Sequence, residues 1–169
     1  MPALPEIVLP SARLVLMYSD MLVKDIPAEQ FGLVPEGVNC NSPAYNYGHM
    51  ALYADMCCDV LGRKDLFKND AKWKELYEFG AKSEADPAGE RYGKKDELLA
   101  RFKERQETAM RAFAEATPEA LDAPMPEGMM GDVMKTKGAM AAFMLTGHPF
   151  GHLGQISTWR RCMGLSMIF

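Results

Sequence analysis

The stretch TGHPFGHLGQISTWRR, residues 146–161, decides how the rest of the chain is interpreted. It holds His148 and His152, two of the three histidines in the sequence. Residues at i and i+4 of a helix lie one above the other on the same face, so the two imidazoles can point at one place, and Gln155 continues that stripe. The spacing therefore predicts a helix that offers two metal ligands and needs a third from elsewhere in the fold.

The third histidine, His49, lies in the stretch NSPAYNYGHMALYADM, residues 41–56. It falls within an apolar helical stripe, so we expect it to face the core. Asp55 points to another side of this helix and Asp59 lies too far along it to join the histidines. The expected ligand set is three neutral nitrogens, which suits Zn(II) or Ni(II) and leaves positions open. The alternative is that these histidines are ordinary hydrogen-bonded core residues.

Apolar spacing and capping signals predict four long helices. The clearest start is Ser42-Pro43, with an N-cap serine followed by proline at the first helical position. The first ten residues contain three prolines and are interpreted as an arm that precedes the first helix. The predicted helices span residues 11–26, 43–61, 96–116 and 135–163.

The apolar residues on each helix predict which face is buried. In the first helix these are Leu14, Met17, Met21 and Leu22. In the last helix the predicted inward stripe includes both histidines, Gln155 and Trp159. Pro149 lies inside that helix and removes a backbone hydrogen bond, which predicts a kink at that residue.

The predicted helices and connections define the fold class. Residues 63–94 form a long connection with a weaker amphipathic piece at residues 71–80. This length suffices to cross a bundle from end to end, so the helices on either side need not be antiparallel neighbours. No useful strand alternation occurs. We therefore expect an all-α four-helix bundle, with a long crossover between helices 2 and 3, as a single domain over residues 1–169.

Composition limits the classes of partner and compartment. The formal net charge is −4 with acids and bases interspersed, which argues against nucleic acid as a partner. No apolar run reaches the roughly 20 residues of a membrane span. The four cysteines lack C-x-x-C spacing, which favours a reducing compartment. These features predict a soluble cytoplasmic protein with no membrane partner.

Two segments carry a family resemblance. NSPAYNYGH, and much later GHPFGHLGQISTWRRCMGL, resemble the DinB/YfiT-like metalloenzyme superfamily, whose members have one histidine early in the second bundle helix and an H-x-x-x-H in the fourth. The resemblance implies the family's four-helix bundle and implies that His49, His148 and His152 are the metal ligands. It also implies a small electrophilic substrate, a low-molecular-weight thiol as co-substrate, and transferase activity in stress or detoxification. The alternative enzymatic function is hydrolysis, in which the metal site activates a water molecule.

Several further residues receive candidate roles. Gln155 is a candidate catalytic residue that orients a ligand histidine or a water molecule, or else makes a core hydrogen bond. Tyr45 is a candidate proton donor; Tyr45 and Tyr53 bracket His49 and otherwise serve as packing. Met125, Met129 and Met130 are candidates for an apolar lid. A non-catalytic metal- or ligand-binding bundle is the alternative function, and homodimerisation through a bundle face is left open.

Overall fold

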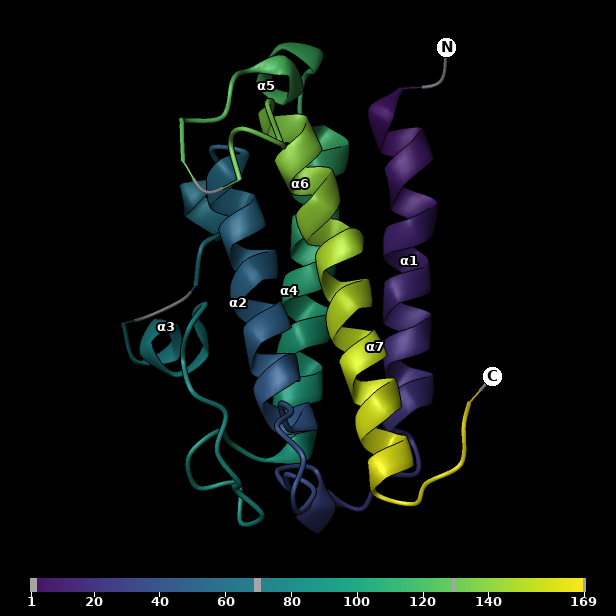
Figure 1. The fold of residues 1–169 in the computed structure, drawn as a ribbon. Coiled ribbons are helices and arrows are strands. Elements are labelled where there is room, and N and C mark those ends of the chain that lie inside the picture. Colours follow the sequence, from purple (N-terminus) through teal and green to yellow (C-terminus); the bar gives the residue numbers. More distant parts are fainter. Residues whose placement is uncertain (1–2, 69–70, 129, 169) are drawn as a thin grey trace.

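The computed structural model describes residues 3–68, 71–128 and 130–168, and within them it is helical, with no strand longer than an isolated bridge. Four rods form the bundle (Figure 1), the last of them broken into two helices. The helices are α1 (Leu4–Val23), α2 (Pro43–Val60), α3 (Ala71–Tyr77), α4 (Lys95–Glu115), α5 (Pro118–Asp122), α6 (Lys137–Leu145) and α7 (Gly147–Cys162), with short 3-10 turns at Ala28–Gln30 and Lys64–Leu66. The all-α bundle predicted from the sequence is confirmed.

The long crossover lies between α2 and α4, as predicted. Figure 1 shows the chain leaving the end of α2, passing α3 on the outside of the bundle, and returning along it before α4 begins. As a result α2 and α4 run in the same direction and pack directly against each other. The crossover covers one side of α2 and positions the carbonyl and aromatic groups that surround His49. In the described residues, no helix is both long and apolar enough to cross a bilayer.

Helix α2 lies at the centre of the bundle. Ser42 caps it by accepting a hydrogen bond from the backbone N–H of Tyr45 at 3.2 Å, and Pro43 occupies the first turn. Almost every residue of α2 up to Cys58 is buried, because α4, α6, α7 and α3 all contact it. Such burial explains why the helix shows almost no difference in polarity between its faces.

Helix α1 departs from the sequence prediction in two ways. It begins at Leu4, so the expected arm is helical from that residue, and Pro10 is accommodated on the exposed side. The buried face consists of Val8, Ala12, Val15, Ser19, Leu22 and Val23. Leu14 and Met17, predicted to be buried, are 47% and 53% exposed. The small residues Ala12 and Ser19 face the bundle because they allow α1 to approach its neighbours closely.

The last rod breaks at Thr146 and not at Pro149. Thr146 has φ −131° and ψ −76°, which separates α6 from α7 and places Pro149 in the first turn of α7, where its missing N–H costs no helical bond. The Leu145 carbonyl that proline leaves unpaired accepts a hydrogen bond from the Gln106 side chain at 2.9 Å. The break therefore removes the conflict that led us to predict a kink inside the helix.

The crossover packs against α2 through a close contact at Gly48. A Cβ atom at this position would lie 2.0 Å from the Tyr77 ring, which is fully buried and donates a hydrogen bond to the Tyr92 carbonyl. By contrast, a Cβ atom at Gly151 or Gly154 of α7 would meet nothing within 4 Å. Of these three helical glycines, Gly48 is the one that packing requires.

Replacement of Gly48 by alanine is expected to lower the free energy of unfolding by about 1–3 kcal/mol, because the ring of Tyr77 cannot move without breaking its own contacts. The matched change Gly154→Ala is expected to raise stability by about 0.5–1 kcal/mol, since the site is open and alanine favours helix. Urea unfolding of the two variants measures both effects. Equal effects in the two variants would contradict the close-contact explanation.

Candidate metal centre

The three histidines meet inside the bundle. His49 comes from α2, while His148 and His152 come from the first turns of α7. The Nε2 atom of His148 lies 3.1 Å from Nε2 of His49 and 3.2 Å from Nε2 of His152. One ligand atom from each ring lies within 4.8 Å of the others. The predicted convergence of residues that are about one hundred positions apart in the chain is confirmed.

His49 is held in one orientation by the crossover. Its Nδ1 atom lies 2.6 Å from the backbone carbonyl oxygen of Tyr77, the last residue of α3. A carbonyl only accepts hydrogen bonds, so Nδ1 carries the proton and Nε2 has a free lone pair. The crossover thus selects the tautomer that metal binding requires.

His152 is held in the same way by a residue that the sequence analysis missed. Its Nδ1 atom lies 2.9 Å from Oδ1 of Asn46, which is fully buried on α2. The amide oxygen accepts the Nδ1 proton, so Nε2 of His152 is also unprotonated. Asn46 lies three residues before His49, one turn away, and this helical spacing was the signal available in the sequence.

The arrangement of nitrogen atoms fits a cation. The Nε2 atoms of His49 and His152 both present lone pairs toward His148, and a single proton on His148 fully satisfies only one of them. With metal–nitrogen bonds of about 2.1 Å, nitrogens at these separations subtend about 95–100° at an ion, between octahedral and tetrahedral values. Three imidazole nitrogens in this arrangement could hold a divalent metal ion.

Burial keeps the cluster neutral. It lowers the pKa of His148 to about 3 and that of His152 to about 4, and the neighbouring histidines add to both shifts. Burial also lowers the pKa of His49, against an opposing effect of the Tyr77 carbonyl. At neutral pH the rings are therefore in the unprotonated form that ligates metals.

Metal-free protein is expected to lose stability as the pH falls from about 6.5 toward 4. In this range the unfolded histidines bind protons that the folded cluster excludes, because the folded pKa values of His148 and His152 are the lower ones. Thermal unfolding of chelator-treated protein at several pH values measures the slope. The double variant His148→Gln, His152→Gln should show a shallower slope, and an unchanged slope would contradict the assignment.

A cavity of about 460 Å³ opens beside the three rings, a size typical of small-molecule sites. It is lined by Asn41, Tyr45, His49, Tyr53, Phe79, Gly80, Ala81, Met130, Phe143, His148, His152 and Gln155. Of the predicted lid methionines, Met130 lines the cavity, Met125 does not, and Met129 lies outside the described residues. The ring of Tyr53 lies 4.5 Å, centroid to centroid, from both His49 and His148.

The two candidate catalytic residues occupy different positions in the cavity. Gln155 is exposed at the rim, which corrects the prediction that it is buried, and its amide oxygen accepts a hydrogen bond from Asn41 at 3.2 Å. The stripe of α7 that carries the two partly buried histidines is exposed to solvent where it reaches Gln155. Tyr45 is buried against His49, but its hydroxyl lies 3.0 Å from the carbonyl oxygen of Ala81, and burial raises its pKa to about 12.

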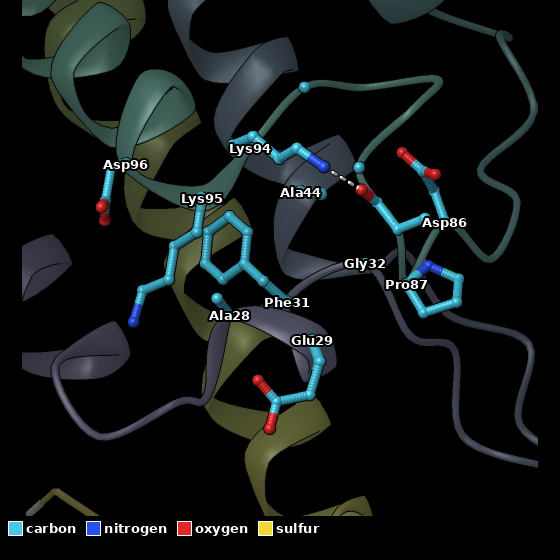
Figure 2. A pocket seen from close by; sticks show the side chains of 13 residues that line it. Ala28, Glu29, Phe31, Gly32, Ala44, Asp86, Pro87, Lys94, Lys95 and Asp96 are labelled. Carbon is cyan, nitrogen blue, oxygen red and sulfur yellow. Dashed lines mark hydrogen bonds between the residues drawn. The ribbon is translucent and has the colours of Figure 1, made fainter.

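A second cavity, of about 310 Å³, lies away from the histidines beside Asp86 and Lys95 (Figure 2). Two of its charged groups, Lys95 and Asp86, are already engaged in hydrogen bonds. Lys95 donates to the carbonyls of Val23, the last residue of α1, and of Ile26 just after it. Asp86 accepts hydrogen bonds from the backbone N–H groups of residues 90–92. These contacts stabilise the loops, so the histidine cavity is the stronger candidate for function.

Comparison with known proteins agrees with this geometry. The family model of the DinB superfamily matches residues 13–156, a range that includes all three histidines. No curated protein and no solved structure matched the sequence. The match extends over most of the chain, and the helical bundle and histidine cluster are consistent with it. The chain belongs to the DinB superfamily.

Proposed function

We propose that the chain is a metal-dependent enzyme that acts on a small electrophilic substrate, with His49, His148 and His152 as the metal ligands. The observation that carries the proposal is the convergence of three histidine Nε2 atoms beside a cavity of small-molecule size. Zinc or nickel is the proposed ion, because neutral imidazole nitrogens suit both.

The cluster offers three protein ligands. Among the described His, Cys, Asp and Glu residues, none joins the three histidines as a fourth ligand. An ion held by three histidines would act as a Lewis acid toward a thiol co-substrate, a water molecule or the electrophile. Three-ligand sites are typical of catalysis and four-ligand sites of structure, so this observation favours an enzyme over a non-catalytic metal-binding bundle.

The chain's own residues would orient the rings and the substrate. Gln155 contacts His152 from the rim and is restrained by Asn41, which suits a positioning role. Tyr45 is proposed as a wall for the His49 ring more than as a proton donor, because its hydroxyl is bound to backbone carbonyls and its pKa is raised. Tyr53 lies close to two of the ligand rings and is the alternative proton donor.

Replacement of Asn46 by leucine is expected to weaken metal binding by about 10–100-fold, since His152 would lose the acceptor that fixes its tautomer. The variant Asn46→Asp keeps an acceptor and should retain or increase affinity. Competition with a chromophoric chelator gives the dissociation constants. If the leucine and aspartate variants bound metal equally, the positioning role of Asn46 would be wrong.

Elemental analysis and an activity screen test the proposed function together. Protein prepared without a histidine tag is loaded with zinc or nickel and offered small electrophiles with several low-molecular-weight thiols, or with water alone. Metal-dependent product formation, lost on chelation and restored by the ion, supports the enzyme. Tight stoichiometric metal with no exchangeable ligand position and no turnover would favour the non-catalytic bundle instead.

The compartment and domain proposals follow from chain-wide features. We propose one domain over residues 1–169, since α1 contacts α4, α6 and α7 and the family match runs through the same helices.

We also propose a cytoplasmic location. All four cysteines are free, and Cys57 and Cys58 are buried in the core as thiols, which suits a reducing environment.

A further inference from the structure

The cavity beside the histidines has no charged wall. Among its described lining residues there is no Lys, Arg, Asp or Glu. Tyr53, Phe79, Phe143 and Met130 supply apolar surface, and Phe79 is 74% exposed at the mouth. Such walls favour contact with an aryl or alkyl group.

Several polar groups of the cavity already have hydrogen-bond partners within the protein. The Tyr45 hydroxyl lies within hydrogen-bond distance of two backbone carbonyls, and the Asn41 amide donates to Gln155. The Nδ1 atoms of His49 and His152 are likewise engaged. A carboxylate or phosphate entering the cavity would find no positively charged partner in the walls.

The crossover segment that lines the cavity carries an ion pair on the protein surface. Glu78 lies beside the crossover segment that lines the cavity, and its carboxylate is 3.8 Å from Lys74 on the surface. The pair has no net charge, and Lys74 is not among the lining residues, so it brings no cation into the cavity.

We propose that this cavity selects compounds that carry no charge other than at the atom that reaches the metal, with an aryl or alkyl body against Tyr53, Phe143 and Met130. This inference rests on the proposed function, because the ion's charge balances a thiolate or an oxygen ligand at the histidines. A second charge, remote from the ion, would be desolvated without compensation. Polar parts of a larger thiol would therefore have to remain outside the cavity.

Three matched thiols test the selectivity on cobalt-loaded protein: phenylmethanethiol, 4-(mercaptomethyl)benzoate and the methyl ester of that acid. Calorimetry gives the affinities, and sulfur-to-cobalt absorption reports whether the thiol ligates the ion. We expect the acid to bind at least about 10-fold more weakly than the parent thiol, and the ester to bind within about 3-fold of it. The ester separates the effect of charge from that of size.

A change at the cavity wall provides the second test. Met130→Lys places an ammonium group at the cavity and should strengthen binding of the acid by about 5–10-fold, whereas Met130→Gln, similar in length and neutral, should not. Thermal unfolding checks that both variants fold. Both variants keep the three histidines.

The possible outcomes distinguish the proposed selectivity of the cavity from the proposed activation of a thiol. Equal or tighter binding of the acid in the wild-type protein, or no heat with either neutral thiol, would overturn the proposed selectivity. Selective binding without sulfur-to-cobalt absorption would preserve the selectivity and remove thiol activation from the proposed function.

Discussion

Replacement of His148 by alanine is expected to weaken metal binding by at least about 1,000-fold, more than the loss of a residue that only orients a ligand. His148 is the ring whose Nε2 lies between the other two, at 3.1 and 3.2 Å, so its removal leaves only two nitrogen ligands. The helix should survive, because His148 lies in the first turn of α7 and is only partly buried. Metal content and chelator competition measure the effect.

The matched control for this variant is Gly151→Ala, one turn along the same helix. That position faces open space and contacts neither the other two histidines nor the cavity, so metal affinity should be unchanged. Circular dichroism of both variants checks the fold. If His148→Ala retained wild-type affinity, His148 would not be a ligand.

Replacement of Asp55 by alanine is expected to lower the free energy of unfolding by about 3–5 kcal/mol. Asp55 is fully buried, and its carboxylate lies 2.8 Å from the guanidinium of Arg105, which is only 2% exposed. Its other oxygen accepts the backbone N–H of Lys68 at 2.8 Å, which fixes the start of the crossover. The alanine variant leaves the Arg105 guanidinium without its buried acidic partner, with only the half-exposed Glu104 as a charged partner. Urea unfolding measures the loss.

Two further variants separate charge from hydrogen bonding at this site. Asp55→Asn keeps an acceptor for Lys68 and should destabilise the fold less than alanine does. Asp65→Ala removes an exposed partner of Arg63 and should change stability little. A loss below about 1 kcal/mol for Asp55→Ala would mean that the buried pair does not stabilise the fold.

The features that local chemistry determines could be predicted from the sequence. Ser42-Pro43 marked the start of α2 because its capping contact involves residues three positions apart. The spacing of His148 and His152 placed both rings on one face because α7 is a regular helix from Gly147 onward. The long connection predicted the crossover because its length could cross the bundle.

The features that depend on neighbouring helices could not be predicted in this way. Leu14 and Met17 are more apolar than Ala12 and Ser19, yet the small residues face the bundle because close approach of α1 outweighs side-chain hydrophobicity. At the break before Thr146, the carbonyl of Leu145 accepts a hydrogen bond from Gln106 on another helix, a contact that local spacing does not indicate.

The groups that surround the three histidines also could not be predicted from local sequence. Asn46 and the Tyr77 carbonyl meet His152 and His49 only after α2, α3 and α7 have packed together. Gln155 continues the histidine stripe in sequence but turns outward to the rim of the cavity. Spacing indicated which histidines come together, whereas the groups that orient them come from tertiary contacts.

X-ray absorption of zinc-loaded protein, prepared without a histidine tag, tests most directly whether three imidazoles share one cation. We predict about one ion per chain, with three histidine nitrogens at about 2.0–2.1 Å and at least one further light-atom ligand that is not from the protein. Zinc bound through sulfur, or through fewer than three histidines, would contradict the account.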